Sequence, residues 1–244
     1  EWKKPINGGE STIFFLPPIG GKQEKIMIQL FEHIDDLEFH RIPESLTERL
    51  QNNEKFESLG LAIKEDRANW DYVYERKKLI ELPGNKYRQK RRNLEDFKEN
   101  YDYEFHLIEK KWIEKCRELQ SKWCDMNECQ KNEDLHEENK AINYALDNFK
   151  ELGFNGGLIM IGDECAAYTL GERLNKNTSV IHIEKAHIKF QGSYQAINQL
   201  FVKNCCDEIK YINREQDLGV KGLRRAKESY KPVFMVKKNI IHKT

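Results

Sequence analysis

The chain has 244 residues, enough for one large domain or two domains of ordinary size with buried cores. Its 41 lysines and arginines balance 41 aspartates and glutamates, which excludes a uniformly basic protein that coats nucleic acid. No run approaches the roughly 18 apolar residues of a membrane-spanning helix and no signal peptide is visible, so we expect a cytoplasmic protein.

The first third of the chain alternates short strands and helices. Apolar runs predict strands at 12–16, 39–42 and 70–75, and apolar residues at helical spacing predict a helix at 23–37. Pro43 suits the first turn of a helix that ends at Leu50. Leu82, Pro83 and Gly84 then mark a boundary. We predict that residues 1–84 belong to a first domain, incomplete at its N-terminus, without a recognisable catalytic grouping.

The second region, 85–244, has a regular order of elements. Helices are predicted at 85–100, 110–123, 137–152, after Gly192 as far as Cys205, and at 218–230; strands are predicted at 103–107, 157–161, 165–174, 178–185, 209–213 and 233–237. From the first strand onward the order is β, α, α, β, β, β, α, β, α, β. This is the element order of the GNAT acyltransferase fold, so we predict an α+β protein whose second domain is a complete GNAT-like domain.

The six cysteines predict no metal site. None forms a CxxC pair, and no Cys/His cluster has zinc spacing. Most lie on predicted apolar faces, so we expect reduced core thiols, with a redox-active vicinal pair as the alternative for the last two. The cysteines are Cys116, Cys124, Cys129, Cys165, Cys205 and Cys206.

Basic residues gather at the start of the helix 85–100, where Lys90 and Arg91 are candidate donor-binding residues. Cations in the first turns of a helix oppose its dipole, and an anion docked there would relieve them. A second row, Lys221, Arg224 and Lys227, follows one side of the helix 218–230 and is a candidate for binding the acceptor end of tRNA or a lipid phosphate. A solvated basic face is the alternative in both places.

The strand 178–185 carries ionisable residues on both faces. Strict alternation puts Val180, His182 and Glu184 on one face and Ile183 and Lys185 on the other. A half-buried strand normally alternates apolar and polar residues, so this pattern indicates a site. Glu184 is the candidate base or acceptor-orienting carboxylate.

Further polar residues follow the strand 209–213. Arg214, like Lys185, is a candidate electrostatic stabiliser of the reaction, and the alternative is a structural ion pair with Glu184. Asn213, Glu215 and Asp217 are candidate substrate-binding residues at the end of this strand, and Asp217 is alternatively a helix N-cap.

The turn before the helix that follows Gly192 departs from the GNAT pattern. GNAT enzymes have Q/R-x-x-G-x-G/A here, and its backbone N–H groups hold the pyrophosphate of the cofactor. The corresponding stretch runs from Lys189 to Tyr194, and Gly192 is its one glycine. A bulky last residue predicts a poor site for CoA and favours a donor borne on tRNA.

Five stretches resemble the phosphatidylglycerol lysyltransferase C-terminal-like family: KYRQKRRNLEDF, HIEKA, GSYQAIN, YINREQDLG and KGLRRAKESYKP. The family is similar to tandem GNAT proteins of the Fem type, which implies that residues 1–84 are part of a degenerate first GNAT-like domain. The resemblance implies an aminoacyltransferase that moves an aminoacyl group from aminoacyl-tRNA to a lipid headgroup or to another amine or hydroxyl acceptor. The sequence assigns no cofactor beyond this donor, with acyl-CoA as the alternative donor.

Two alternatives remain open at the level of the sequence. One is an N-acyltransferase that uses acyl-CoA and a small amine. The other is a non-catalytic module that binds tRNA or an anion, whose binding would fall steeply with salt.

Overall fold

The computed structural model describes residues 2–5 and 11–244, with side chains from residue 13 onward, and divides the chain into two compact units. Unit 1 contains the chain up to Tyr72 together with Gln216–Lys227 and Phe234–Thr244. Unit 2 contains Val73–Glu215 and Glu228–Val233. The division therefore comes before the boundary expected near residue 84, and C-terminal segments return to unit 1.

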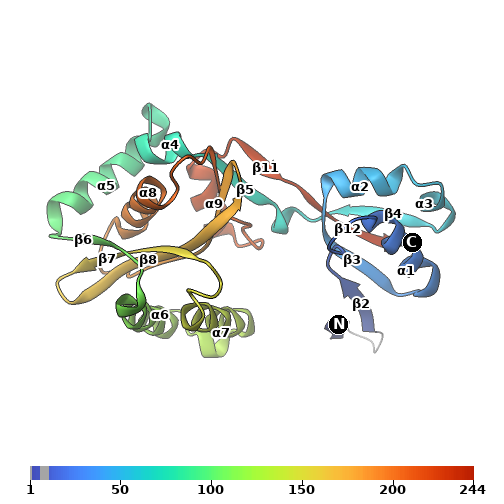
Figure 1. The fold of residues 1–244 in the computed structure, drawn as a ribbon, viewed down its shortest axis with the longest axis horizontal. Helices are drawn as coiled ribbons and strands as arrows, with labels where there is room; N and C mark the ends of the chain where they lie inside the picture. Colours follow the sequence, from blue (N-terminus) through green and yellow to red (C-terminus); the bar gives the residue numbers. More distant parts are fainter. Residues whose placement is uncertain (1, 6–10) are drawn as a thin grey trace. The chain divides into compact units, whose positions relative to one another are not determined.

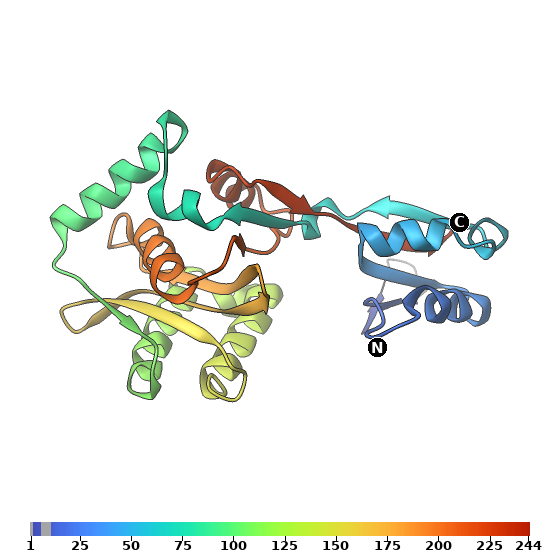
Figure 2. The same ribbon diagram turned by 45° about the horizontal axis from the view of Figure 1, so that its top comes forward.

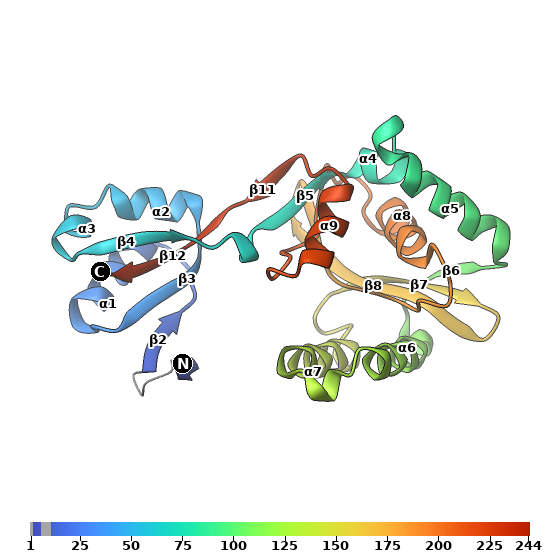
Figure 3. The ribbon, with the colours of Figure 1, turned by 180° about the vertical axis from the view of Figure 1, so that it is seen from behind.

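Unit 1 is built on a five-stranded sheet that the end of the chain completes (Figure 3). β12 (Lys238–Lys243) lies between β3 (Leu37–Pro43) and β4 (Leu61–Glu65) and is antiparallel to both. β2 (Ser11–Phe15) runs parallel to β3, and β1 (Trp2–Pro5) is antiparallel to β2. Because β12 supplies the buried Ile241, residues from both ends of the chain share one core.

The helices of unit 1 are short. Before Tyr72 they are α1 (Gln23–His33), α2 (Glu44–Gln51) and α3 (Lys55–Ser58), and most of α9 (Lys221–Ser229) also belongs to this unit. α2 begins directly after Pro43, whose φ of −59° suits a helix start, and it buries Leu46 and Leu50, which are one turn apart. Apolar spacing predicted α1 and Pro43 predicted the start of α2, although α1 ends four residues earlier than expected.

Unit 2 is built on a mixed sheet with helices on both faces (Figure 1). Its strands, in spatial order, are β5 (Asp71–Glu75), β10 (Tyr211–Asn213), β9 (Thr178–Ala186), β8 (Glu164–Asn175), β7 (Asn155–Ile161) and β6 (Glu104–Leu107). β11 (Phe234–Val236) belongs to the segment that returns to unit 1. From β5 to β6, only β9 and β10 are parallel neighbours.

Two helix layers cover this sheet (Figure 2). α6 (Ile113–Met126) and α7 (Glu133–Asp147) cover one face, and α8 (Ser193–Cys205) covers the other, with α4 (Arg76–Glu81) and α5 (Arg88–Asn100) packed on α8. The core under α6 and α7 contains Leu119, Ile142 and Tyr168. α9 (Lys221–Ser229) follows β10, and single 3₁₀ turns occur at 67–69, 85–87, 110–112 and 129–131. The predicted GNAT order is thus confirmed.

One cysteine prediction is wrong, because Cys124 and Cys129 form a disulfide. α6 ends at Met126, and the chain then turns back through the 3₁₀ turn at 129–131, which brings the two Cα atoms within 5.0 Å. The sequence spacing alone did not show this reversal. The other four cysteines are free.

The parallel pair β9–β10 is short and sets up the site. Only Thr178–Val180 pair with Tyr211–Asn213, while β9 continues to Ala186. The two strands therefore separate beyond Asn213, as strands four and five of a GNAT domain do.

A β-bulge in β9 lies just beyond this separation. Leu170 pairs with Ile183 but Gly171 pairs with Ile181, so His182 is an extra residue in β9. Strict alternation placed His182 and Glu184 on the same face of β9, and the bulge puts them on opposite faces. Glu184 contacts Asn198 of α8, whereas the ring of His182 lies 5.5 Å from Phe154, which packs on the core under α6 and α7.

Candidate functional site

An ion pair between Glu184 and Arg214 lies where β9 and β10 separate. Arg214 directly follows β10, and its Nη2 donates to Glu184 Oε1 at 2.7 Å. Both side chains are only 12% exposed. The second carboxylate oxygen accepts from Asn198 Nδ2 at 2.9 Å. The structure thus brings together two of the three candidate catalytic residues and fixes the carboxylate from both sides.

Two tyrosines frame the guanidinium of Arg214. Its Cζ lies 4.9 Å from the ring centre of Tyr230 and 5.8 Å from that of Tyr74. Burial raises the pKa of Tyr230 to about 12, so its hydroxyl keeps its proton at neutral pH. Burial opposes the charge of Arg214, but Glu184, Tyr74 and Tyr230 together outweigh it and the pKa of Arg214 is raised. The site therefore holds a permanent cation beside a carboxylate.

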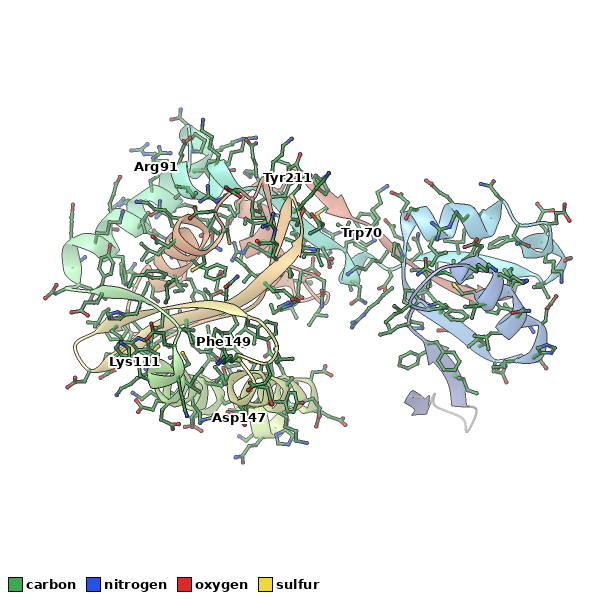
Figure 4. All side chains as sticks on the ribbon, in the orientation of Figure 1. Trp70, Arg91, Lys111, Asp147, Phe149 and Tyr211 are labelled. Carbon is green, nitrogen blue, oxygen red and sulfur yellow. A yellow bond between two sulfur atoms is a disulfide. The ribbon has the colours of Figure 1, made fainter. Side chains whose placement is uncertain are left out.

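Of the two basic candidates on α5, only Lys90 reaches this site. Its Nζ lies 4.4 Å from the ring centre of Tyr230, and burial followed by the charge of Arg214 lowers its pKa. Arg91 instead donates to the carbonyl oxygens of Leu82 and Gly84, so it holds the turn before α5 (Figure 4).

Lys185 lies on the other face of the sheet from Glu184. Its Nζ stands 3.5 Å from the ring centre of Trp123 and 2.9 Å from Glu138 Oε2, both contributed by α6 and α7. The residue is 6% exposed, and burial lowers its pKa. The expectation that residues 184 and 185 point in opposite directions is correct, but the ammonium has its own counterion away from Arg214.

His182 joins two strands through carboxylates. Its Nδ1 lies 2.8 Å from Glu215 Oε1 and its Nε2 lies 3.0 Å from Glu172 Oε1. The hydrogen bond to Glu215 is the main cause of a raised pKa at His182. Asn213 is buried, and its side chain accepts from the backbone N–H of Glu215 at 2.7 Å. Asn213 and Glu215, expected as substrate contacts, thus shape the turn after β10.

The turn at Gly192 is covered by α5. Gly192 has a φ of 87°, and a Cβ atom there would lie 2.4 Å from the backbone oxygen of Asn93. The backbone N–H of Gln191 already donates to the hydroxyl of Tyr101 at 3.2 Å. The N–H of Ser193 donates to the oxygen of Phe190 at 3.1 Å. In a GNAT domain, N–H groups of this turn would face the cofactor.

Tyr194, the residue that departs from the GNAT pattern, reaches back to β9. Its hydroxyl accepts from Trp123 Nε1 at 3.3 Å and is hydrogen-bonded to the backbone of Ala186, the last residue of β9. Burial raises the pKa of Tyr194. The side chain therefore ties α6 and α8 to the part of β9 that β10 leaves unpaired.

Asp217 is the fully buried centre of a separate cluster in unit 1. It accepts from Tyr72 Oη at 2.6 Å, from the backbone N–H of Gly219 at 2.8 Å and from Arg67 at 3.2 Å. Arg224 binds both carboxylate oxygens, at 2.8 and 3.0 Å. Burial opposes ionisation, but the hydrogen bonds of Arg224, Tyr72 and Gly219 hold the pKa of Asp217 well below its usual range.

This cluster changes the interpretation of the basic row on α9. Arg224 is bound to Asp217, and Lys227 donates to the backbone oxygen of Gln216 at 2.8 Å. Lys221 is exposed at the start of α9. Two of the three residues therefore hold the loop before α9, and α9 starts four residues beyond Asp217, so this carboxylate is not its N-cap.

The sequence did not predict a site role for Asn198, Tyr74 or Tyr230. Asn198 was detectable as a single amide on an otherwise apolar helix face, but the two tyrosines look like core residues in the sequence. Among residues 13–244, no group of three His, Cys, Asp or Glu side chains could hold a metal ion. In the same part of the chain, no helix has the length and apolarity needed to cross a membrane.

Comparison with known proteins identifies relatives of this fold. A curated protein of Mycoplasmoides gallisepticum, described as uncharacterized, is 25% identical over 182 residues, which cover 71% of this chain and 56% of the relative. The chain therefore spans little more than half the length of that relative. The crystal structure of a conserved protein of unknown function from Bacteroides thetaiotaomicron is 33% identical, with a TM-score of 0.84 over 95% of this chain and 79% of that chain.

Two more distant structures share the fold. The C-terminal domain of a putative lysylphosphatidylglycerol synthetase from Agrobacterium fabrum has a TM-score of 0.66 at 12% identity, covering 95% of this chain and 76% of its own. FemX has a TM-score of 0.55 at 8% identity, covering 99% of this chain and 83% of its own. These likenesses and the element order make the fold GNAT-like.

The family model described as "Phosphatidylglycerol lysyltransferase, C-terminal" matches residues 6–241, nearly the whole chain. This confirms the resemblance carried by the five sequence stretches. The chain belongs to the phosphatidylglycerol lysyltransferase C-terminal family.

Proposed function

We propose that this protein is an aminoacyltransferase that takes its aminoacyl group from aminoacyl-tRNA and passes it to a hydroxyl or amine acceptor, such as a lipid headgroup. The family supports transfer of an aminoacyl group, because its name describes a lysyltransferase. The donor is inferred from the geometry of this chain.

The covered turn at Gly192 is the observation that carries the choice of donor. A pyrophosphate needs several backbone N–H groups that point into open space. Here the N–H groups of Gln191 and Ser193 already have partners, and α5 lies against Gly192. Tyr194 also contacts Ala186, at the end of β9 that β10 does not pair with. Acyl-CoA would have to displace these contacts, whereas an aminoacyl ester on tRNA needs only its aminoacyl end to enter.

Glu184 and Arg214 supply the chemistry in this proposal. Glu184 accepts the proton of the acceptor as its hydroxyl or amine attacks the ester carbonyl, and Arg214 stabilises the oxyanion of the tetrahedral intermediate. The bond from the carbonyl carbon to the ribose oxygen then breaks, and the ribose oxygen takes the proton from Glu184. A carboxylate offers about four lone-pair positions, so the bonds from Arg214 and Asn198 leave room for the acceptor.

A transfer assay tests the proposal. Charged tRNAs with labelled amino acids are incubated with the protein and with phosphatidylglycerol vesicles or small amines, and the labelled acceptor is measured. We expect transfer from at least one charged tRNA, and Glu184→Gln should slow it by about a hundredfold or more. The matched control is Glu164→Gln, an exposed carboxylate that pairs with Lys189 at 2.9 Å and should leave the rate unchanged.

Two results would overturn the proposal. The first is failure to transfer from, or deacylate, any charged tRNA while Glu184→Gln and Arg214→Lys leave any other detected activity intact. The second is calorimetric binding of CoA at submillimolar concentration, which would favour an acyl-CoA donor and would show that α5 yields at Gly192.

A further inference from the structure

Lys90 is a half-buried cation that no carboxylate among residues 13–244 contacts, although the charge of Glu184 acts on it through space. Over residues 13–244 its side chain has no hydrogen bond or ion pair, and its contact is the ring of Tyr230, 4.4 Å from Nζ. A buried or half-buried ammonium normally has an anionic partner, because leaving water is costly for a charge. The structure therefore presents a cation whose partner is not one of these residues.

Arg214 adds to the positive charge at this place. Its Cζ lies 4.9 Å from the centre of the same tyrosine ring. Glu184 is the carboxylate that contacts Arg214, so these two cations and one carboxylate leave one positive charge.

The start of α5 strengthens the positive potential. The first turn of this 13-residue helix contains Arg88, Lys90 and Arg91 and no acidic residue. The N-terminal end of a helix carries a partial positive charge, so cations there are unfavourable unless an anion is bound nearby. This second observation, independent of the contact with Tyr230, also indicates an anionic ligand.

The geometry points to a phosphate-binding site at Lys90, beside Arg214 and Tyr230, which holds the phosphate of a hydroxyl acceptor for transfer. This inference rests on the proposed function. The single unpartnered ammonium fits one phosphate group, whereas a nucleic-acid backbone presents a series of them. Lys90 and Arg214 lie against the same ring of Tyr230, and Arg214 binds Glu184, so a phosphate held by Lys90 would place a hydroxyl a few bonds away near the carboxylate.

Binding of small phosphates tests the site without any turnover. The wild-type protein is titrated by calorimetry with glycerol 3-phosphate, dihexanoyl phosphatidylglycerol and inorganic phosphate. We expect the two glycerol phosphates to bind, and Lys90→Gln to weaken them by about tenfold or more, since a charge-assisted hydrogen bond is lost. Lys90→Arg keeps the charge and should bind within a few-fold of wild type, which separates loss of the ligand contact from loss of folding.

Lys86→Gln is the matched control. Lys86 also stacks on a tyrosine, with Nζ 5.4 Å from the ring centre of Tyr87, but it is exposed. It should bind both glycerol phosphates like the wild type. Equal binding by Lys90→Gln and the wild type, or equal weakening by Lys86→Gln, would overturn the site.

The source of the phosphate is decided by comparing ligands. Glycerol 3-phosphate binding better than inorganic phosphate supports an acceptor headgroup. Binding of a CCA-ended RNA minihelix that depends on Lys90, with no binding of either glycerol phosphate, would instead assign Lys90 to tRNA and overturn the acceptor. Lys90-dependent binding of the glycerol phosphates without transfer from any charged tRNA would refute the proposed function and leave the site in place.

Discussion

Replacing Asp217 by asparagine removes a buried charge while keeping the shape of the side chain. The carboxylate is fully buried and accepts five hydrogen bonds, three of them from arginines. Asparagine keeps one acceptor oxygen but adds an NH₂ group that faces the guanidinium of Arg224. Since the remaining cations lose their counter-charge, we expect Asp217→Asn to destabilise the protein.

The size of the loss follows from the geometry. Breaking a buried ion pair by removing one partner costs about 3–5 kcal/mol. The side chains of Arg67 and Arg224 are 31% and 36% exposed, so water screens part of their charge. We therefore expect the free energy of unfolding, measured by urea denaturation at pH 7, to fall by about 2–4 kcal/mol.

The pH dependence gives a second measurement. The folded-state pKa of Asp217 is depressed, so its contribution is fully present above the unfolded-state pKa of about 3.9 and is lost as the pH falls toward the folded value. The difference between wild type and Asp217→Asn should therefore shrink below about pH 4. Asp207→Asn is the control, because Asp207 is 80% exposed and pairs with Arg76. Equal losses for the two variants at pH 7 would refute the argument.

Three further changes have expected results. Gly192→Ala should lower the unfolding free energy by about 2 kcal/mol or more, well beyond Gly153→Ala, which also has a positive φ but no atom within 4 Å of the added Cβ; equal losses would contradict the contact with α5. His182→Gln should destabilise the protein most at low pH. The pKa of His182 is raised in the folded state, so the histidine stabilises the fold fully below its unfolded-state pKa of about 6.5, and this stabilisation is lost as the pH rises through the folded-state pKa. A pH-independent difference between variant and wild type would contradict the pairing of His182 with the two glutamates. Cys129→Ser should cost about 2 kcal/mol from the short loop it opens, and a reductant should reproduce this in the wild type but leave the variant unchanged.

The sequence predicted the elements of unit 2 better than their contacts. Periodicity and turn residues located α8, β9 and β10, and the charged residues in and after those strands pointed to Glu184 and Arg214. The sequence left two interpretations of Arg214 open, an electrostatic stabiliser of the reaction or a structural ion-pair partner of Glu184. The ion pair forms because β10 lies parallel to β9, and this pairing joins residues about 30 positions apart, which no local pattern encodes.

Contacts made across long separations account for what the sequence missed. β12 inserts between β3 and β4 although almost 200 residues separate it from β3, so the division of the chain was not visible as a composition change. Asp217 looked like a helix cap because polar residues before helices usually are caps. Two of its partners, Arg67 and Tyr72, lie about 150 positions earlier in the chain. The covering of Gly192 by α5 is likewise a contact between helices separated by almost a hundred residues.

The bulge at His182 explains why Glu184 faces Arg214. β9 pairs with β10 only as far as Val180, and the extra residue follows two positions later. A bulge bends its strand and changes the phase of the alternation, so β9 turns away from β10 where the site begins. Before the bulge, Ser179 faces Cys206 at the end of α8; after it, Glu184 takes that face.

If β9 alternated strictly from Ser179 with no bulge, Glu184 would lie on the face of α6 and α7, away from Asn198 and Arg214. His182 is also the residue that is held from both sides, by Glu172 on β8 and by Glu215 after β10. The same histidine therefore supplies the phase change and anchors the two strands that must separate. His182 therefore holds the site in shape through its two carboxylate partners, whereas Glu184, two residues further along β9, is the proposed general base.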